Sequence, residues 1–308
     1  MLRGMKRFAA IDCGTNTVLL TIADVGADGS VTAVLERAEI TRLGEGLSAT
    51  GSISDAAAER TRLVFSDYVQ VIEAQGCTRV MAVGTEALRR AKNGTAIVAG
   101  IDAELARIGG ALEIIAGERE AQLAFHAVQG SFPDLVGPRT VVDIGGGSTE
   151  LVVGDREVER AISIPIGSVV LTEKHLKSDP PTADERRALE RAIDEALAAA
   201  PALAGLVVGI AGTVTTYAAI TLGLADYDAT KVHGMTLDRA ALEREVARLG
   251  AMRIDDRRRT PGLQPKRADV IYAGGVILCR ILAKARVHEC RVSDKGVRWA
   301  LLYEAARC

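Results

Sequence analysis

Two short segments of the sequence combine an acidic residue with glycines and with side chains that donate hydrogen bonds. The segment DCGTNT (12–17) ends one apolar run, and DIGGGS (143–148) ends another in the same spacing. Glycines after a buried strand allow a tight turn that aims successive N–H groups at one point, where a phosphate oxygen is the usual occupant. One such segment alone is more often a hairpin turn. Two in register favour phosphate binding, by Gly14, Thr15, Asn16 and Thr17 and by Gly145, Gly146, Gly147 and Ser148.

Acidic residues beside these loops predict a divalent cation. A carboxylate next to bound phosphate repels it unless a cation lies between them, and Mg²⁺ is typically held by one or two carboxylates and by substrate oxygens. Asp143 stands at a strand end and Glu150 on the returning strand, so these two are the expected metal ligands. For Asp12, a metal role and a turn-capping role are equally compatible with the sequence. A third segment of the same kind, GIAGT (209–213), follows another apolar run.

Composition and missing motifs exclude several classes of protein. The formal net charge is −2 and only 3% of residues are aromatic, which argues against nucleic-acid binding. The five cysteines are scattered with no C-x-x-C pair, so a disulfide framework and a zinc site are not indicated, and a cytoplasmic location is expected. The motif G-x-x-x-x-G-K-[ST] does not occur, so the sequence has no Walker-type P-loop. The motif G-x-G-x-x-G is also missing, which argues against a dinucleotide-binding domain. The uncharged stretch 196–225 could span a bilayer by length, but its prolines, glycines and threonines favour a buried strand, loop and helix.

The elements around the loops repeat, because each half is predicted to follow the order β-β-β-α-β-α-β-α. Ser54 is expected to cap the first long helix, and Thr182 with Glu185 forms a capping box for its counterpart. In the first half the strands and helices after the loop are expected at 31–40, 55–74, 79–83, 96–108, 112–116 and 118–128. In the second half they are expected at 157–165, 183–200, 206–210, 214–222, 288–293 and 297–306.

Alternating strands and helices of this kind imply an α/β fold in two lobes, each a mixed five-stranded sheet covered by helices. The expected division is 1–125 and 126–308, with the last helix, about 295–308, able to pack back on the first lobe. An interlobe cleft with the glycine loops facing each other is expected from such a duplication. The charge run 255–259 is expected to be a solvated face.

Several ordered segments resemble the exopolyphosphatase / guanosine pentaphosphatase family, which belongs to the actin-like ATPase superfamily with its duplicated ribonuclease-H-like fold. IDCGTNTVLL and VVDIGGGSTEL are similar to the family's two phosphate loops, and IIAGEREAQLAF (114–125) to its catalytic-glutamate stretch. MAVGTEALRRAKNG (81–94), VGIAGTVTTYAAI (208–220) and GLQPKRADVIYAGGVIL (262–278) follow in the family's order. The resemblance extends through nearly the whole chain.

Carried over by position, the resemblance makes Glu120 the base that activates the attacking water, with Glu118 as the second choice. The sequence by itself offers a structural alternative, since acidic residues commonly stabilise a helix N-terminus. The resemblance also places Arg89 and Arg267 near the phosphates, where a guanidinium can neutralise an anion. Arg42 matches the family pattern as well, without an assigned role.

The resulting expectation is an exopolyphosphatase that hydrolyses terminal phosphate from inorganic polyphosphate and uses Mg²⁺ as its cofactor. Mn²⁺ and K⁺ are further candidate ions. The same site could instead hydrolyse guanosine pentaphosphate, or bind guanosine tetraphosphate or another nucleotide without turnover. A nucleotide-dependent switch or filament protein and a small-molecule kinase are the other classes that fit the fold. Neither nucleic acid nor membrane is an expected partner, and a homodimer is left open.

Overall fold

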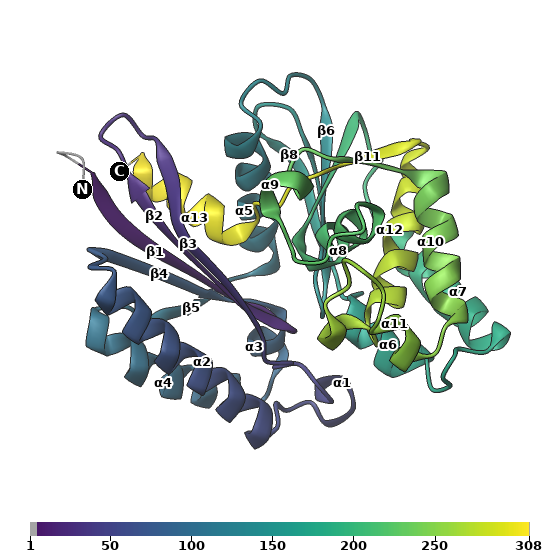
Figure 1. Cartoon of the computed structure of the whole chain (residues 1–308), viewed down its shortest axis with the longest axis horizontal. Helices are drawn as coiled ribbons and strands as arrows, with labels where there is room; N and C mark the ends of the chain where they lie inside the picture. Colours follow the sequence, from purple (N-terminus) through teal and green to yellow (C-terminus); the bar gives the residue numbers. More distant parts are fainter. Residues whose placement is uncertain (1–4, 308) are drawn as a thin grey trace. The chain divides into compact units, whose positions relative to one another are not determined.

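The computed structural model describes residues 5–307, which divide into two units (Figure 1). The first unit contains the residues up to 130 and those from 297 onward, and the second contains 131–296. The expected boundary after residue 125 falls inside helix α5 (Gly117–Ser131). Helix α13 (Val297–Ala306) belongs to the first unit, although it follows the last strand of the second in sequence.

The sheet of the first unit has five strands in the order β3-β2-β1-β4-β5. The first three strands pair antiparallel, whereas β1, β4 and β5 run parallel. This mixture follows from the connections, because a short loop joins antiparallel neighbours and a helical crossover joins parallel ones. The strands are β1 (Lys6–Cys13), β2 (Thr17–Val25), β3 (Val31–Ile40), β4 (Arg79–Gly84) and β5 (Leu112–Ile114).

Helices cover both faces of this first sheet. Ile11 and Leu20 point to the face packed by α2 (Asp55–Ala74) and α4 (Gly94–Leu105). Alternate residues along a strand point to opposite faces, so Ala10 joins the other apolar cluster, with α5 and α13. The predicted cap of α2 is confirmed, since the Ser54 side chain accepts a hydrogen bond from the Ala57 N–H at 3.2 Å. Two shorter helices, α1 (Leu47–Thr50) and α3 (Glu86–Arg90), complete the unit with a 3₁₀ turn at Ala106–Ile108.

The second unit repeats the arrangement with a sheet in the order β10-β11-β9-β6-β7-β8. Strand β7 pairs antiparallel with β6 on one side and with β8 on the other. Strand β9 pairs parallel with both β6 and β11. The duplicated mixed-sheet fold predicted from the sequence is therefore confirmed. The strands are β6 (Arg139–Ile144), β7 (Thr149–Gly154), β8 (Val158–Ile164), β9 (Leu206–Ile210), β10 (Thr236–Asp238) and β11 (Glu289–Val292).

The prediction was wrong on two points in this unit. Its sheet has six strands, not five, because β10 adds an antiparallel edge strand to β11. The repeat pattern also missed helices between 239 and 285. One of them is the apolar helix α12, whose Gly274 and Gly275 let Thr213 and Tyr217 of α8 approach it closely. The helices are α6 (Ser168–His175), α7 (Ala183–Leu197), α8 (Ala211–Thr221), α9 (Ala229–Val232), α10 (Arg239–Ala251), α11 (Ile254–Arg257) and α12 (Ile271–Ala285), with a 3₁₀ turn at Pro265–Arg267.

The long uncharged stretch forms a buried strand and a buried helix, as predicted. Residues 196–225 hold the end of α7, the buried strand β9 and helix α8. Among residues 5–307, no helix has the length and apolar character needed to cross a bilayer.

Candidate active site

The carboxyl ends of three parallel strands in the first unit meet at one edge of the sheet. Cys13 at the end of β1 lies beside Gly84 of β4, and Gly84 lies beside Ile114 of β5. The segments that follow these strands are the loop at 14–17, helix α3 and helix α5. Ligands of open α/β sheets bind at this edge, so the strand order itself gathers the predicted residues of this unit.

The loop at 14–17 is closed by a hydrogen bond from the Gly14 N–H to the Thr17 carbonyl at 3.0 Å. Thr15 and Asn16 are buried in it. The Asn16 carbonyl accepts the N–H groups of Thr41 and Arg42 at 3.1 and 3.0 Å. Arg42 adopts a left-handed backbone conformation with φ 53°, which is uncommon for a residue with a side chain. The Arg42 segment thus braces the loop at 14–17.

Glu120, the predicted base, lies in a cluster with Arg89 at the same edge. The Arg89 Nη1 donates to Glu120 Oε2 at 3.2 Å and to the Ile115 carbonyl at 2.7 Å. Its Nη2 donates to Glu86 Oε2 at 2.6 Å. Burial lowers the pKa of Arg89, but the carboxylates of Glu120 and Glu86 outweigh it and the pKa is raised overall. The cluster therefore holds two carboxylates around one permanent cation.

The two candidate bases occupy different environments. Glu120 is buried, with 7% of its surface exposed, whereas Glu118 is solvent-exposed on the same helix. Sequence reasoning missed Glu86, which is also buried and which pairs with Arg89 three residues along α3. Its spacing of i to i+3 from Arg89 was the available signal. Only the tertiary structure adds Glu120 to that pair.

The second unit builds its loop at 145–148 in the same way. The Gly145 N–H donates to the Ser148 carbonyl at 3.0 Å, and the Gly146 carbonyl accepts the N–H groups of Val169 and Val170 at 2.9 and 3.2 Å. A methyl group on Gly167 would lie 2.3 Å from the Gly146 carbonyl. This loop is consequently packed directly against the first turn of α6.

The predicted metal ligands are direct neighbours in the second sheet. Asp143 on β6 and Glu150 on β7 are paired residues of the antiparallel ladder, so their side chains share a face. Both are buried, and Glu150 Oε1 accepts a hydrogen bond from Ser163 Oγ at 2.6 Å. No cluster of three or more His, Cys, Asp or Glu suited to a metal occurs among the described residues. Two buried carboxylates fit Mg²⁺ held jointly with substrate oxygens and water, not an all-protein cage.

Arg267 lies at the loop at 209–213, the second glycine loop of this unit. Strand β9 ends beside Asp143, and the Thr213 hydroxyl after it donates to the Ile144 carbonyl at 3.3 Å. A methyl group on Gly212 would lie 2.2 Å from Arg267 Nη1, so the guanidinium rests against the start of α8. Ala211 there has φ 66°. A non-glycine residue in this conformation is strained by about 1–3 kcal/mol, and such strain is frequent at functional sites.

The predicted residues thus form two sets. Glu120 and Arg89 lie at the edge of the first sheet that carries the loop at 14–17. In the second unit, Asp143 and Glu150 flank the loop at 145–148, and Arg267 contacts the loop at 209–213. Asp12 has a buried Oδ1 with no hydrogen-bond partner among the described residues, and burial raises its pKa to about 6.

Comparisons with known proteins identify the family of the chain. Residues 21–307 match the Ppx/GppA phosphatase family. Exopolyphosphatase 2 of Mycobacterium tuberculosis is 40% identical over 293 residues, which cover 92% of each chain. The crystal structure of the Ppx/GppA family member of Aquifex aeolicus has 35% identity and a TM-score of 0.83 over 98% of both chains. An exopolyphosphatase structure from Cytophaga hutchinsonii has 25% identity and a TM-score of 0.87 over 98% of both chains.

The family matched is the one that the loop and glutamate segments resemble, and the match spans both units. The actin-like fold expected from that resemblance agrees with the high structural similarity of the solved relatives. The chain is accordingly a member of the Ppx/GppA phosphatase family.

Proposed function

We propose that this protein is an exopolyphosphatase, which hydrolyses the terminal phosphoanhydride bond of inorganic polyphosphate. The observation that carries the proposal is the buried Glu120, held by Arg89 at the sheet edge beside a glycine loop. A relative named an exopolyphosphatase is 40% identical across almost its full length, which supports polyphosphate as the substrate class.

In this proposal the glycine loops bind the phosphates. The N–H groups of Gly14 and Gly145 close the loops, and other backbone N–H groups within 14–17 and 145–148 donate to phosphate oxygens. The side chains of Thr15, Thr17 and Ser148 add hydroxyl donors. Arg267 adds positive charge at the second loop. Fixed donors and charges of this kind stabilise the negative charge of the transferring group, which is most of the catalysis in phosphoryl transfer.

Glu120 acts as the base in the same proposal. Arg89 beside it favours the ionised form of the carboxylate, because an opposite charge stabilises that form. An ionised Glu120 accepts a hydrogen bond from a water molecule and orients it toward the terminal phosphorus. The water oxygen forms the new P–O bond while the bridging oxygen leaves on the shortened chain, and the water proton passes toward Glu120. Glu86 holds Arg89 from the other side.

Asp143 and Glu150 would hold Mg²⁺ in this scheme. The ion would supply positive charge that offsets the charge of the polyphosphate chain. Two buried carboxylates on adjacent strands repel each other, and a shared cation relieves that repulsion.

The experiment is a phosphate-release assay on the purified chain with Mg²⁺, comparing wild type, Glu120→Gln and Glu118→Gln. Removal of the base should lower kcat by about 10²–10⁴-fold, whereas the exposed Glu118 should be replaceable with little change. Equal loss in both variants, or none in Glu120→Gln, would contradict the assignment. Long polyphosphate, guanosine pentaphosphate and ATP serve as parallel substrates. Release from guanosine pentaphosphate alone would replace the proposed specificity, and binding of a nucleotide without release would replace the hydrolase.

A further inference from the structure

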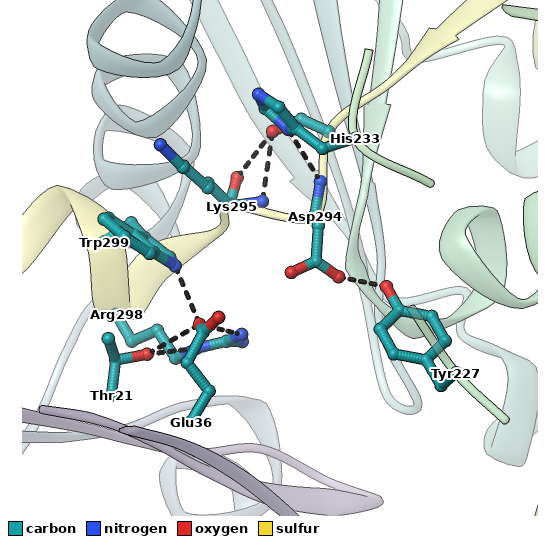
Figure 2. Close-up of polar contacts among 9 residues, drawn as sticks. Thr21, Glu36, Tyr227, His233, Asp294, Lys295, Arg298 and Trp299 are labelled. Carbon is teal, nitrogen blue, oxygen red and sulfur yellow. Dashed lines mark hydrogen bonds and ion pairs between the residues drawn. The ribbon is translucent and has the colours of Figure 1, made fainter. Parts of the chain in front are cut away.

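Helix α13 contacts the first sheet through a closed network of polar side chains (Figure 2). The Arg298 Nη2 and the Trp299 Nε1 both donate to Glu36 Oε1, at 2.9 and 3.0 Å. The Thr21 hydroxyl donates to the same oxygen at 3.2 Å and accepts from Arg298 Nε at 2.6 Å. Arg298 is buried, so its guanidinium is fixed by groups on β2 and β3.

The strand register places this network on the same face of the sheet as Asp12. Thr21 lies opposite Ala10 on β1 and opposite Glu36 on β3. Asp12 follows Ala10 by two residues, and residues two apart on a strand share a face. The charge of Arg298 accordingly acts on Asp12, whose pKa is raised by burial and lowered by this arginine.

The residues paired with Asp12 on the two neighbouring strands are apolar. Leu19 lies opposite it on β2 and Val83 beside it on β4. Helix α5 brings Leu123 and Ala127 to this face, and the buried Glu120, which is paired with Arg89, lies one turn before Leu123 on the same helix. Glu36 is the acidic group behind Arg298, and the thiol of Cys13 belongs to the apolar cluster of the opposite face. The positive charge of Arg298 therefore favours the ionised carboxylate of Asp12. The negative charge of Glu36, which is bound to Arg298, partly offsets that effect.

We propose that Arg298 is a positioning residue that keeps Asp12 ionised beside the loop at 14–17. An ionised Asp12 can only accept hydrogen bonds, so it orients water at the loop, whereas a protonated Asp12 would donate to bound phosphate instead. Thr21 and Glu36 hold the guanidinium in place, and Trp299 fixes Glu36. The kinetic part of this inference depends on the proposed function, but the electrostatic part does not.

The test measures the ionisation of Asp12 directly. The full-length chain is labelled with ¹³C at aspartate side chains, the Asp12 carboxyl resonance is identified by its loss in Asp12→Asn, and its pKa is followed by titration. Arg298→Met should raise that pKa by about one unit or more, because an opposite charge is removed. Glu36→Gln keeps the acceptor oxygen and removes its charge, so it should lower the pKa. Arg298→Lys should restore most of the wild-type value.

Phosphate release as a function of pH gives the second reading. The acidic limb of kcat should move to higher pH in Arg298→Met and to lower pH in Glu36→Gln, with smaller changes in KM. An unchanged Asp12 pKa in both variants would overturn the inference. A shifted pKa with an unmoved acidic limb would overturn the role in the reaction. Absence of hydrolysis in the wild type would disprove the proposed function, while the titration would still support or overturn the control of Asp12 by Arg298.

Discussion

The loops at 14–17 and 145–148 are built alike but have different neighbours. Each is closed by one N–H to carbonyl hydrogen bond of 3.0 Å between its first and fourth residues. An acidic residue precedes each loop, but its partner on the next strand differs. Asp12 lies opposite Leu19 in the first unit, and Asp143 lies opposite Glu150 in the second. The first loop is braced by the backbone of the largely buried segment at 41–44, whereas the second packs on the first turn of α6.

In the proposed mechanism this difference separates two chemical tasks. In the second unit the returning strand supplies a second carboxylate, which suits a cation. In the first unit the additional carboxylates, Glu86 and Glu120, come from helices and are paired with Arg89. A carboxylate beside an arginine suits the orientation of water. The two units thus have the same loop, and the residues around the loop make the difference.

Loss of a carboxylate from the Asp143–Glu150 pair should have a large effect on the Mg²⁺ dependence of phosphate release. Asp143→Asn should raise the Mg²⁺ concentration needed for half-maximal phosphate release by at least about tenfold. Loss of a residue that only hydrogen-bonds a metal ligand already lowers metal affinity by about tenfold or more. The measurement is the rate as a function of Mg²⁺ concentration. Glu159→Gln, which removes an exposed carboxylate from the neighbouring strand β8, is the matched control and should leave the curve unchanged. Identical curves for all three proteins would remove the distinction between the loops.

The supports of the two loops can be compared by adding one methyl group to each. In Gly167→Ala the methyl group meets loop backbone at 2.3 Å, whereas in Gly44→Ala it meets the Thr15 Cγ2 at the same distance. A side chain can rotate away, but the loop backbone must shift, and a small displacement can cost up to about 10²-fold in rate. We expect kcat/KM to fall about tenfold or more in Gly167→Ala and much less in Gly44→Ala. The reverse order would show that the first loop is the more rigidly held.

A smaller effect concerns the cap of α2, the long helix of the first unit. Ser54→Ala removes the hydrogen bond to the Ala57 N–H and should cost about 1 kcal/mol of unfolding free energy. Urea denaturation followed by circular dichroism measures this. Ser54→Asn preserves a capping oxygen and should stay close to wild type. Equal destabilisation by both substitutions would point to a role of Ser54 other than capping.

The smallest effect is expected at the corresponding helix of the second unit, where the predicted capping box is present. Glu185 accepts the N–H groups of Thr182, Lys177 and Ser178, which lowers its pKa from 4.5 to about 2. A lowered folded-state pKa stabilises the fold above the unfolded value and loses that contribution as the pH falls toward the folded value. The urea midpoint of Glu185→Gln should therefore lie below wild type near pH 6 and approach it near pH 2. A constant difference would contradict this.

Local sequence patterns predicted much of the fold correctly. The strand at 31–40, the strand at 206–210 and the helix at 297–306 have the predicted bounds. The apolar helix α12 was missed because Gly274 and Gly275 are typical of loops, and only contact with Thr213 and Tyr217 explains them. In the charge run 255–259, the outer residues form exposed pairs as expected, but Arg257 is buried and donates to the Leu249 carbonyl at 2.6 Å. Its position on the inner face of a short helix has no local signal.

The sequence by itself determined the two strand–loop–strand units, the helix caps and the acidic residues beside the loops, because hydrogen bonds between near neighbours encode these features. Only the tertiary structure decided that Glu86 and Glu120 share Arg89, and that α13 returns to the first sheet with Arg298 on the face of Asp12. The contact of Arg89 with Glu120 joins residues 31 positions apart, and that of Arg298 with Thr21 joins residues 277 apart. They depend on strand order and on which face each helix covers, which are properties of the packed core and not of any short segment.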